Sequence, residues 1–360
     1  MNDNIYIMWL SRVKGINSKK LDRLIEYFGT AKEVYSASRS ELSEAASADD
    51  SDSIFRASHD GSMDMYVTAL HKTGAKYISK YDEIFPKSLK YIDDIPTGVY
   101  YKGMLPNENY RLVSIVGSRR CSEYGRRVSI KLASDLAKRD VGIVSGLADG
   151  VDSFSHMGAL RESGYTVAVL GTSIDKCYPA ENIKLYERIV ENNGCVMSEY
   201  APYEKTYGAD FVRRNRIIAG LSEILVVVEA EIKSGTSSTV SAALDYGKGI
   251  FAVPGSVFSA YSEGTNRMIR DGCMLALSYK DILREMNIEE KKTENKKSAD
   301  IEGIDKEGIK IIEALNDGEA DFDTLAAKTG IQASKLRTEL TMLEIRKIVS
   351  KRPGQKYIIL

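Results

Sequence analysis

The sequence predicts an α/β protein with a Rossmann-like, doubly wound parallel sheet, a small helical N-terminal domain and a winged-helix-like C-terminal domain. Six short apolar runs alternate with helical stretches, and their continuous hydrophobicity is typical of strands that are covered on both faces. Apolar residues at helical spacing precede these runs, and a charged segment with three more helical stretches follows them. The runs are LVSIV (112–116), VGIV (141–144), TVAVL (166–170), CVMS (195–198), ILVVV (224–228) and IFAV (250–253).

Composition and periodicity divide the chain into five predicted parts. The first is helical, because apolar residues recur at helical spacing around a KGINSKK turn. The second is rich in tyrosine and is broken by Pro86 and Pro96, so we expect an extended connector packed on the core. In order, the parts are a small SAM or helix-hairpin-helix-like domain (1–75), the connector (76–111), the Rossmann-like domain (112–286), a charged linker (287–302) and a winged-helix-like domain (303–360).

The composition excludes several classes of protein. The four cysteines are widely spaced and form no CxxC pair, and the chain has only three histidines, so we expect neither a metal site nor a disulfide framework. No apolar run approaches the ~20 residues of a membrane span, and the N-terminal stretch lacks the features of a secretory leader. Neither GxGxxG nor GxxxxGK[ST] occurs, which argues against a dinucleotide cofactor and a P-loop. We therefore expect a cytoplasmic protein without a cofactor.

In doubly wound sheets, ligands bind beyond the carboxyl ends of the strands, so the turns after the predicted strands are the candidate sites. The first turn, GSRRCSEYGRR (117–127), begins with Gly117 and Ser118 and carries four arginines. Cations at a helix N-terminus oppose its dipole by a few tenths of a kcal/mol each, so they indicate a bound anion. A solvated basic surface is the alternative. The four are Arg119 and Arg120 in the turn, and Arg126 and Arg127 in the first turns of the helix.

A second arginine cluster lies in DFVRRNRIIAG (210–220), where Arg213, Arg214 and Arg216 surround Asn215. Guanidinium groups can bind successive phosphates in forked geometry, which lysine offers less well. Their mutual repulsion requires a counter-charge. Glu199 or Asp210 could supply it instead, in an internal network.

A third candidate follows the fifth predicted strand, where Lys233, Ser234, Gly235 and Thr236 lead into a helix. Small hydroxyl residues and a glycine at a helix start can form an anion-binding nest, although a plain Ser or Thr cap is common. Since the net charge of −1 gives no overall attraction to nucleic acid, any polyanion site depends on such local clusters.

The turn after the second strand, VSGLADGVD (144–152), has the glycines of a phosphate cradle but carries Asp149 and Asp152. We expect Asp152 to cap the following helix and Asp149 to lie at the margin of the anion site. His156 is expected to be a packed, hydrogen-bonded residue. Glu199 and Glu229 end strands without a nucleophile or metal-ligand pattern, so no catalytic residue is assigned.

Taken in order, SIVGSRRCSEYG, IVSGLADGVDSFSHMGAL, TVAVLGTSIDKCYPAEN, MSEYAP, the stretch from RRNRIIAG to FAVPG, and EGTNRMIRDGC resemble the DprA (Smf) family of DNA-processing proteins over roughly residues 75–286. The resemblance implies an extended Rossmann domain that binds single-stranded DNA in the bacterial cytoplasm. It also implies a homodimer that loads RecA recombinase during natural transformation and is not known as an enzyme.

Carried over by position, the family's motifs match the residues that the charge argument selects. The VGxR arginine is Arg119, the RNR element lies at residues 213–216, and the SG nest is Ser234 and Gly235. Asp149 departs from the basic or polar residue that the family commonly has in SGLAxGID, which puts a phosphate contact from this turn in doubt.

Two alternatives remain from the residues. A nucleotide phosphoribohydrolase of the lysine-decarboxylase-like (LOG) family would show PGGxGTxxE, but Thr239 stands in place of the glutamate and the double glycine is absent. A duplex-DNA regulator would use a recognition helix near residues 332–346. There, Lys335, Arg337, Arg346 and Lys347 are offset by Glu339 and Glu344, which favours a protein contact.

Overall fold

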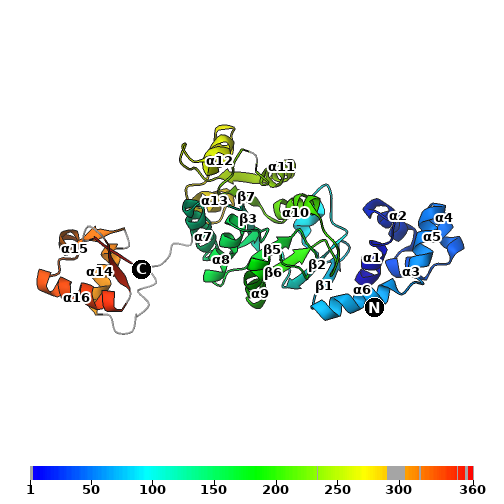
Figure 1. Ribbon diagram of the computed structural model, residues 1–360, viewed down its shortest axis with the longest axis horizontal. Helices are drawn as coiled ribbons and strands as arrows, with labels where there is room; N and C mark the ends of the chain where they lie inside the picture. The colour runs from blue at the N-terminus through cyan, green and yellow to red at the C-terminus, as the bar shows by residue number, and fades with distance from the viewer. Residues whose placement is uncertain are drawn as a thin grey trace. The chain divides into compact units, whose positions relative to one another are not determined.

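Residues 3–232, 234–289, 305–315, 318–346, 348–352 and 356–359 are described by the computed structural model, which divides into two units, Met1–Glu289 and Glu290–Leu360 (Figure 1). The first unit begins with short helices around a core of large apolar residues that includes Trp9, Leu21 and Ile54. These helices are α1 (Asp3–Leu10), α2 (Ser18–Phe28), α3 (Ala31–Ser36), α4 (Arg39–Ala45), α5 (Ala48–Ala57) and α6 (Ser62–Thr73).

The described strands of the first unit form one sheet in the order β1-β2-β6-β5-β4-β3-β7-β8-β9. From β6 to β9 all neighbours are parallel, whereas β1 and β2 add to the edge in antiparallel register. The strands are β1 (Lys76–Ser79), β2 (Gly98–Gly103), β3 (Arg111–Val116), β4 (Val141–Ser145), β5 (Thr166–Leu170), β6 (Cys195–Ser198), β7 (Ile224–Val227), β8 (Gly249–Ala252) and β9 (Met274–Leu275).

All six predicted strands are present, and helices cover both faces of the sheet as the fold class requires. Alternate side chains of β3 point to opposite faces: Leu112 and Val116 pack in one apolar cluster, and Val113 and Ile115 in another. Helices α10 (Gly208–Leu221) and α11 (Ser237–Asp245) pack on the first face, with α12 (Ala260–Arg270) beside them. The other face holds α7 (Glu123–Ala137), α8 (Val151–Arg161), α9 (Ile183–Glu191) and α13 (Tyr279–Glu285).

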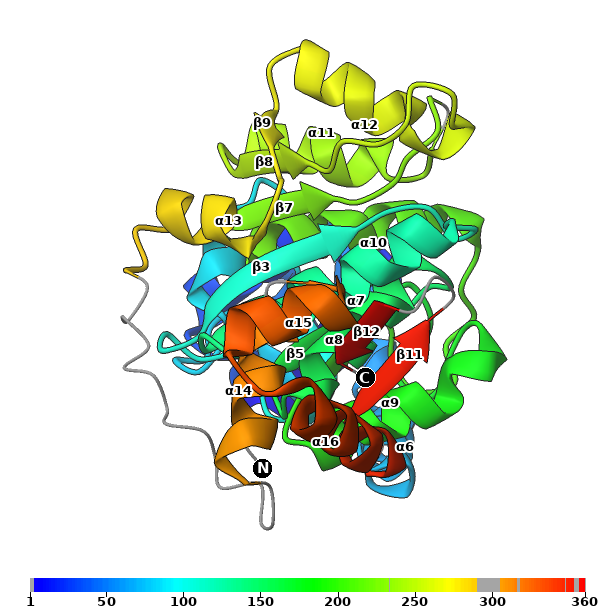
Figure 2. The same ribbon diagram turned by 90° about the vertical axis from the view of Figure 1, so that its left-hand side faces the viewer.

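The chain order reverses between β3 and β7, which lie side by side in Figure 2. From β3 the chain winds outward through β4, β5 and β6, and after β7 it winds the other way through β8 and β9. Connections that leave in opposite directions open a crevice at this switch point, beyond the carboxyl ends of the two strands. The first and third candidate turns follow β3 and β7, so the topology brings them together.

The predicted connector contributes more than an extended linker. Its strands β1 and β2 extend the sheet, and a short 3₁₀ helix, Lys87–Tyr91, packs Leu89 against the same apolar cluster as α10. The predicted charged linker begins with described residues 287–289, and its remainder, 290–302, lies outside the described residues.

The second unit has the winged-helix arrangement expected from its sequence. Three helices surround buried residues such as Leu325 and Leu336, and a small sheet runs in the order β10-β12-β11. Its elements are α14 (Lys306–Leu315), β10 (Ala320–Asp321), α15 (Phe322–Thr329), α16 (Ala333–Ile345), β11 (Val349–Arg352) and β12 (Lys356–Ile359).

Candidate nucleic-acid interface

A pocket of about 430 Å³ lies at the switch point, between the carboxyl ends of β3 and β7. It receives residues from the turn after β3, from helix α10 and from the segment after β7. We call it the switch-point pocket. Of the residues predicted for a phosphate site, it is lined by Gly117, Ser118, Arg119, Arg120, Arg214, Asn215, Ser234, Gly235 and Thr236.

The turn after β3 is held by its backbone. A Cβ atom on Gly117 would lie 2.6 Å from Val151 Cγ2 and 2.9 Å from the Glu229 carbonyl oxygen, so only glycine fits this close approach. The Ser118 N–H donates to the Glu229 carbonyl (2.8 Å), and the Ser118 carbonyl accepts from the Val151 N–H (3.2 Å). The turn is therefore fixed to both the β7 end and the α8 start.

Arg119 and Arg120 project from this fixed turn and are exposed. Within the described part of the chain, neither forms an ion pair with an acid. The Arg119 guanidinium lies 6.0 Å from the centre of the Phe211 ring. Two unpaired guanidinium groups on a fixed turn are suited to binding phosphate, because only the side chains, and not the backbone, must be ordered when the anion binds.

Arg214 occupies the floor of the pocket and is only 4% exposed. Its Nη1 donates to the carbonyls of Gly146 (2.8 Å) and Val169. Burial lowers the pKa of Arg214 to about 10, an effect that the Asp152 carboxylate opposes. Burial likewise raises the pKa of Asp152, and Arg214 opposes that shift. The guanidinium is thus part of the folded interior, with one edge on the pocket.

The capping role predicted for Asp152 is wrong. Helix α8 begins after Gly150, which has φ +75°, and Asp152 lies within its first turn. Its carboxylate points back and accepts the Gly146 N–H of the glycine-rich turn (3.1 Å). The positive charge of Arg214 also acts on this carboxylate. Asp149, in the same turn, is exposed and its Oδ1 lies 3.5 Å from the Asn182 amide nitrogen.

Arg213 and Arg216 lie away from the residues that line the switch-point pocket. Arg216 pairs with Glu199 (Nη2 to Oε1, 2.6 Å) and with Asp94 (Nε to Oδ2, 2.9 Å). Arg213 is 55% exposed and its Nε lies 3.8 Å from Asp94 and 3.9 Å from Glu199. Arg213 and Arg216 are three residues apart and share one face of α10. Because the helix turns by about 100° at each residue, Arg214 lies on a different face. The internal network considered for this cluster therefore exists around Glu199.

The segment after β7 closes the pocket. The Ser234 hydroxyl accepts from the Thr236 N–H (3.3 Å), and the Asn215 amide donates to the Ser238 hydroxyl (2.8 Å), which joins α10 to the start of α11. Thr236 precedes α11 without a side-chain cap, so its hydroxyl does not occupy the helix N-terminus. Lys233 lies outside the described residues.

The sequence did not assign three of the polar or charged residues that line the pocket to an anion site: Asp152, Glu231 and Thr239. With Arg119, Arg120 and Arg214, the lining carries three cations against two acids. Glu231 lies, like Ser234, in the segment after β7. Its place beyond a strand end was the one feature of the sequence that could have marked it as a pocket residue. The excess of positive charge is small and is concentrated on the turn after β3.

Arg126 lines a neighbouring groove. Its Nη1 lies 3.0 Å from Glu123 Oε2, and its guanidinium lies 5.5 Å from the centre of the Phe154 ring. Arg126 lies in the first turn of α7, after the turn that lines the switch-point pocket.

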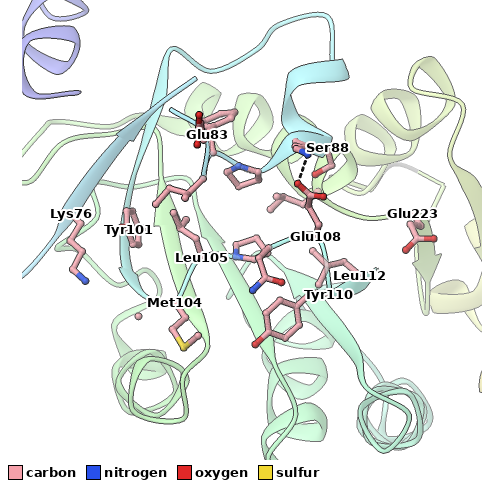
Figure 3. A pocket seen from close by; sticks show the side chains of 18 residues that line it. Lys76, Glu83, Ser88, Tyr101, Met104, Leu105, Glu108, Tyr110, Leu112 and Glu223 are labelled. Atoms are coloured by element: carbon pink, nitrogen blue, oxygen red, sulfur yellow. Dashed lines mark ion pairs between the residues drawn. The ribbon is translucent and has the colours of Figure 1, made fainter. Parts of the chain in front are cut away.

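A further pocket, of about 540 Å³, lies near the amino ends of β3 and β7, at the opposite edge of the sheet (Figure 3). Leu105, Leu112 and Tyr110 give it an apolar wall, and an ion pair joins Lys87 to Glu108 at its rim. Its lining has two lysines and three glutamates, and doubly wound sheets bind ligands at the other edge. It is therefore not the candidate anion site.

Lys335 and Arg337 of α16 have partners within the second unit. Lys335 pairs with Glu307, and the Arg337 guanidinium lies 5.5 Å from the centre of the Phe322 ring. Arg346 also has a partner, and Lys347 lies outside the described residues. In the residues that the structure describes, no helix combines the length and hydropathy needed to cross a membrane.

Fold and site together define a doubly wound α/β protein with an arginine-bearing pocket at the switch point and a winged-helix unit after it. The chain belongs to the DNA recombination-mediator protein A family, whose model matches residues 76–287. The DprA winged helix domain matches residues 295–355. The family resemblance drawn from the motifs is thereby confirmed.

Curated relatives include the DNA processing protein DprA of Streptococcus pneumoniae, 40% identical over 57% of this chain and 72% of the relative. Protein Smf of Escherichia coli is 30% identical over 76% of this chain and 74% of the relative. The X-ray structure of DprA from Streptococcus pneumoniae matches with a TM-score of 0.66 and 31% identity, over 78% of this chain and 97% of that one. A Helicobacter pylori DprA structure, titled for its single-stranded DNA binding mode, matches with a TM-score of 0.53 and 29% identity, over 60% and 97%.

Proposed function

We propose that this chain binds single-stranded DNA in the switch-point pocket and, as a recombination mediator, loads RecA onto DNA taken up in natural transformation. Family membership supports the role, and the Helicobacter pylori relative is described as binding single-stranded DNA. One observation carries the proposal: the turn that presents Arg119 and Arg120 is fixed at both ends and leaves both guanidinium groups without an acid partner in the described chain.

Backbone phosphates supply most of the sequence-independent affinity for nucleic acid, which makes that affinity salt-dependent. A chain with a net charge of −1 can still bind a single strand when its unpaired cations share one edge of a sheet. In this proposal Arg119 and Arg120 bind phosphates, the start of α11 supplies backbone donors, and Arg214 holds the floor of the pocket in place.

Filter binding with single-stranded and duplex oligonucleotides, at salt concentrations from about 50 to about 300 mM, tests the proposal. We expect a preference for the single strand and a loss of roughly tenfold for Arg119→Ala, as expected for one charge-assisted contact. Lys32→Ala, which removes an exposed cation from α3, is the matched control and should bind as the unmodified chain does. Equal affinity for duplex and single strand, or an unchanged Arg119→Ala, would overturn the proposal.

The recombinase step needs its own measurement. We propose that the protein acts as a cytoplasmic homodimer and that it speeds the assembly of RecA on strands already covered by single-strand-binding protein. Light scattering would give the mass of the dimer, and filament assembly would be followed with and without the chain. A monomer at micromolar concentration, or no change in assembly rate, would contradict this part.

We propose no enzymatic role for the pocket. Thr239 occupies the place of the glutamate that the related phosphoribohydrolases use, and it is only 2% exposed. Asp152 is buried, its carboxylate accepts the Gly146 N–H, and it interacts electrostatically with Arg214. Release of free base from nucleoside monophosphates by the purified chain would show that this part of the proposal is wrong.

A further inference from the structure

A groove of about 920 Å³ lies between helices α7 and α13. We call it the α7 groove. Its lining includes Tyr124, Arg127 and Lys131 of α7, Arg161 at the end of α8, and Leu277 before α13. Only Cys121 and Ser122 separate the turn of the switch-point pocket from α7, so the two sites are continuous along the chain.

One face of α7 carries a row of cations along this groove. Arg127, Lys131 and Lys138 are spaced by four and seven residues, which places them on the same side of the helix. The row extends over eleven residues, or ~17 Å at 1.5 Å per residue. Arg161 is beside it, because Ser134 of α7 donates a hydrogen bond to the adjacent Glu162 (2.6 Å).

Two of these cations form no ion pair with an acid among the described residues. Lys131 pairs with Asp135 (2.9 Å), and Lys138 lies 3.5 Å from Glu162. Arg127 and Arg161 are exposed, and neither forms an ion pair with a described acid. Arg127 also lies in the second turn of α7, where its charge opposes the helix dipole. A polyanion in the groove would offset the unfavourable dipole interaction of Arg127 and would give Arg161 an ion-pair partner.

The groove also offers surfaces on which bases can stack. Tyr124 is 47% exposed, and its hydroxyl donates to the Pro254 carbonyl (2.7 Å), which fixes the ring at the rim. Leu277 is 72% exposed on the other side. Unpaired cations beside aromatic and apolar side chains suit a single strand, whose phosphates and unstacked bases both need partners. A duplex has its bases covered and would leave the apolar side unused.

We propose that the α7 groove is a second segment of the binding path for single-stranded DNA. The strand leaves the switch-point pocket beyond Arg120, crosses the first turn of α7 and places its next phosphates on Arg127 and Arg161. This inference rests on the proposed function and deepens it, because it extends the site beyond the pocket. It requires that the groove matter for long strands and not for short ones.

The test compares an oligothymidylate of about 6 nucleotides, near the lower end of the ~4–16 nucleotide range of single-strand site sizes, with one of about 30, which exceeds that range. Fluorescence anisotropy would be measured for the full chain and for Arg127→Ala/Arg161→Ala. We expect the variant to bind the short strand within about twofold of the unmodified chain and the long strand at least about tenfold more weakly. The salt slope for the long strand should fall by ~1.4, since each single-strand phosphate contact contributes ~0.7.

The matched control is Arg23→Ala/Lys32→Ala, which removes two exposed cations from α2 and α3 and should leave both affinities unchanged. The conservative Arg127→Lys/Arg161→Lys variant should retain most of the long-strand affinity. An unchanged long-strand affinity overturns the inference, as does an equal loss for both lengths or a loss confined to duplex DNA. If the unmodified chain binds neither strand, the proposed function itself fails, and this result is distinct from the others.

Discussion

The two arginine clusters of this chain look alike in sequence but differ in where their charge lies. In the turn cluster (Arg119, Arg120, Arg126 and Arg127) all four side chains are exposed, and only Arg126 has an acid partner among the described residues. In the helix cluster (Arg213, Arg214 and Arg216) two side chains are buried against carbonyls and acids. The number of arginines in a sequence segment therefore does not tell how many of them are free to bind a ligand.

The difference follows from where each cluster lies in the fold. The turn cluster follows a strand at the edge where ligands bind. The turn is held by backbone hydrogen bonds and by the Glu229 carboxylate, which accepts from the Ser122 N–H and hydroxyl, and not by its arginine side chains. The helix cluster belongs to α10, whose inner face packs on the sheet through Ile217 and Ile218. A guanidinium carried into that interface must find hydrogen-bond partners, because burying an unpaired charge is costly.

The largest expected effect concerns Arg214. In Arg214→Met, Asp152 remains buried without its cation and two carbonyls lose a donor, so the free energy of unfolding should fall by about 3–5 kcal/mol. Urea unfolding at neutral pH measures it. Adding Asp152→Asn to the variant should restore part of the loss. A decrease below ~1 kcal/mol would show that the two clusters do not differ as described.

A pH-dependent effect follows from His156, which lies near Arg214. Its Nδ1 lies 2.7 Å from the Thr166 hydroxyl, and burial, with a contribution from Arg214, lowers its pKa from 6.5 to about 3. Below pH 6.5 the unfolded chain takes up a proton that the folded chain refuses, so stability falls as the pH falls. Between about pH 8 and about pH 5 the loss from this group should be ~2 kcal/mol.

The control for this prediction is His156→Gln, which cannot titrate in that range. Urea midpoints at both pH values would be compared for the two proteins, since only the difference in pH dependence isolates the histidine from Asp152 and the other acids. Identical pH dependence would mean that the folded state lets His156 protonate.

The turn cluster should contribute little to stability. Arg119→Ala/Arg120→Ala is expected to change the free energy of unfolding by less than ~0.5 kcal/mol, because both side chains are exposed and unpaired in the described chain. Thermal or urea unfolding checks this, in parallel with the binding assays. A destabilisation as large as that of Arg214→Met would remove the contrast between the clusters.

The smallest expected effect on DNA binding concerns Asp149. It is exposed on the turn next to Ala148, which lines the switch-point pocket, so its carboxylate opposes phosphate at the margin of the site. Asp149→Arg should tighten single-strand binding by about threefold at low salt, with the gain screened as salt increases. Unchanged or weaker binding would place this residue outside the path of the DNA.

Local patterns in the sequence predicted the core strands of the sheet, because each of these strands is a continuous apolar run. The candidate turns were chosen because doubly wound sheets bind ligands beyond the carboxyl ends of their strands. The turns after β3 and β7 both line the switch-point pocket. The connector strands were missed, since KYIS and GVYYKG lack the apolar continuity of the core strands. The electrostatic interaction between Arg214 and Asp152 could not be predicted, because it joins residues 62 positions apart through the packing of α10 on the sheet.

The central claim is that the switch-point pocket, with its turn cluster, is where single-stranded DNA binds. The most direct measurement is photochemical cross-linking of a 4-thiothymidine-substituted single strand to the full chain, with the modified peptides identified by mass spectrometry. We expect adducts in peptides that contain residues 117–127 or 234–240, and their loss in Arg119→Ala/Arg120→Ala. Adducts confined to the N-terminal helices or to the winged-helix unit would contradict the claim.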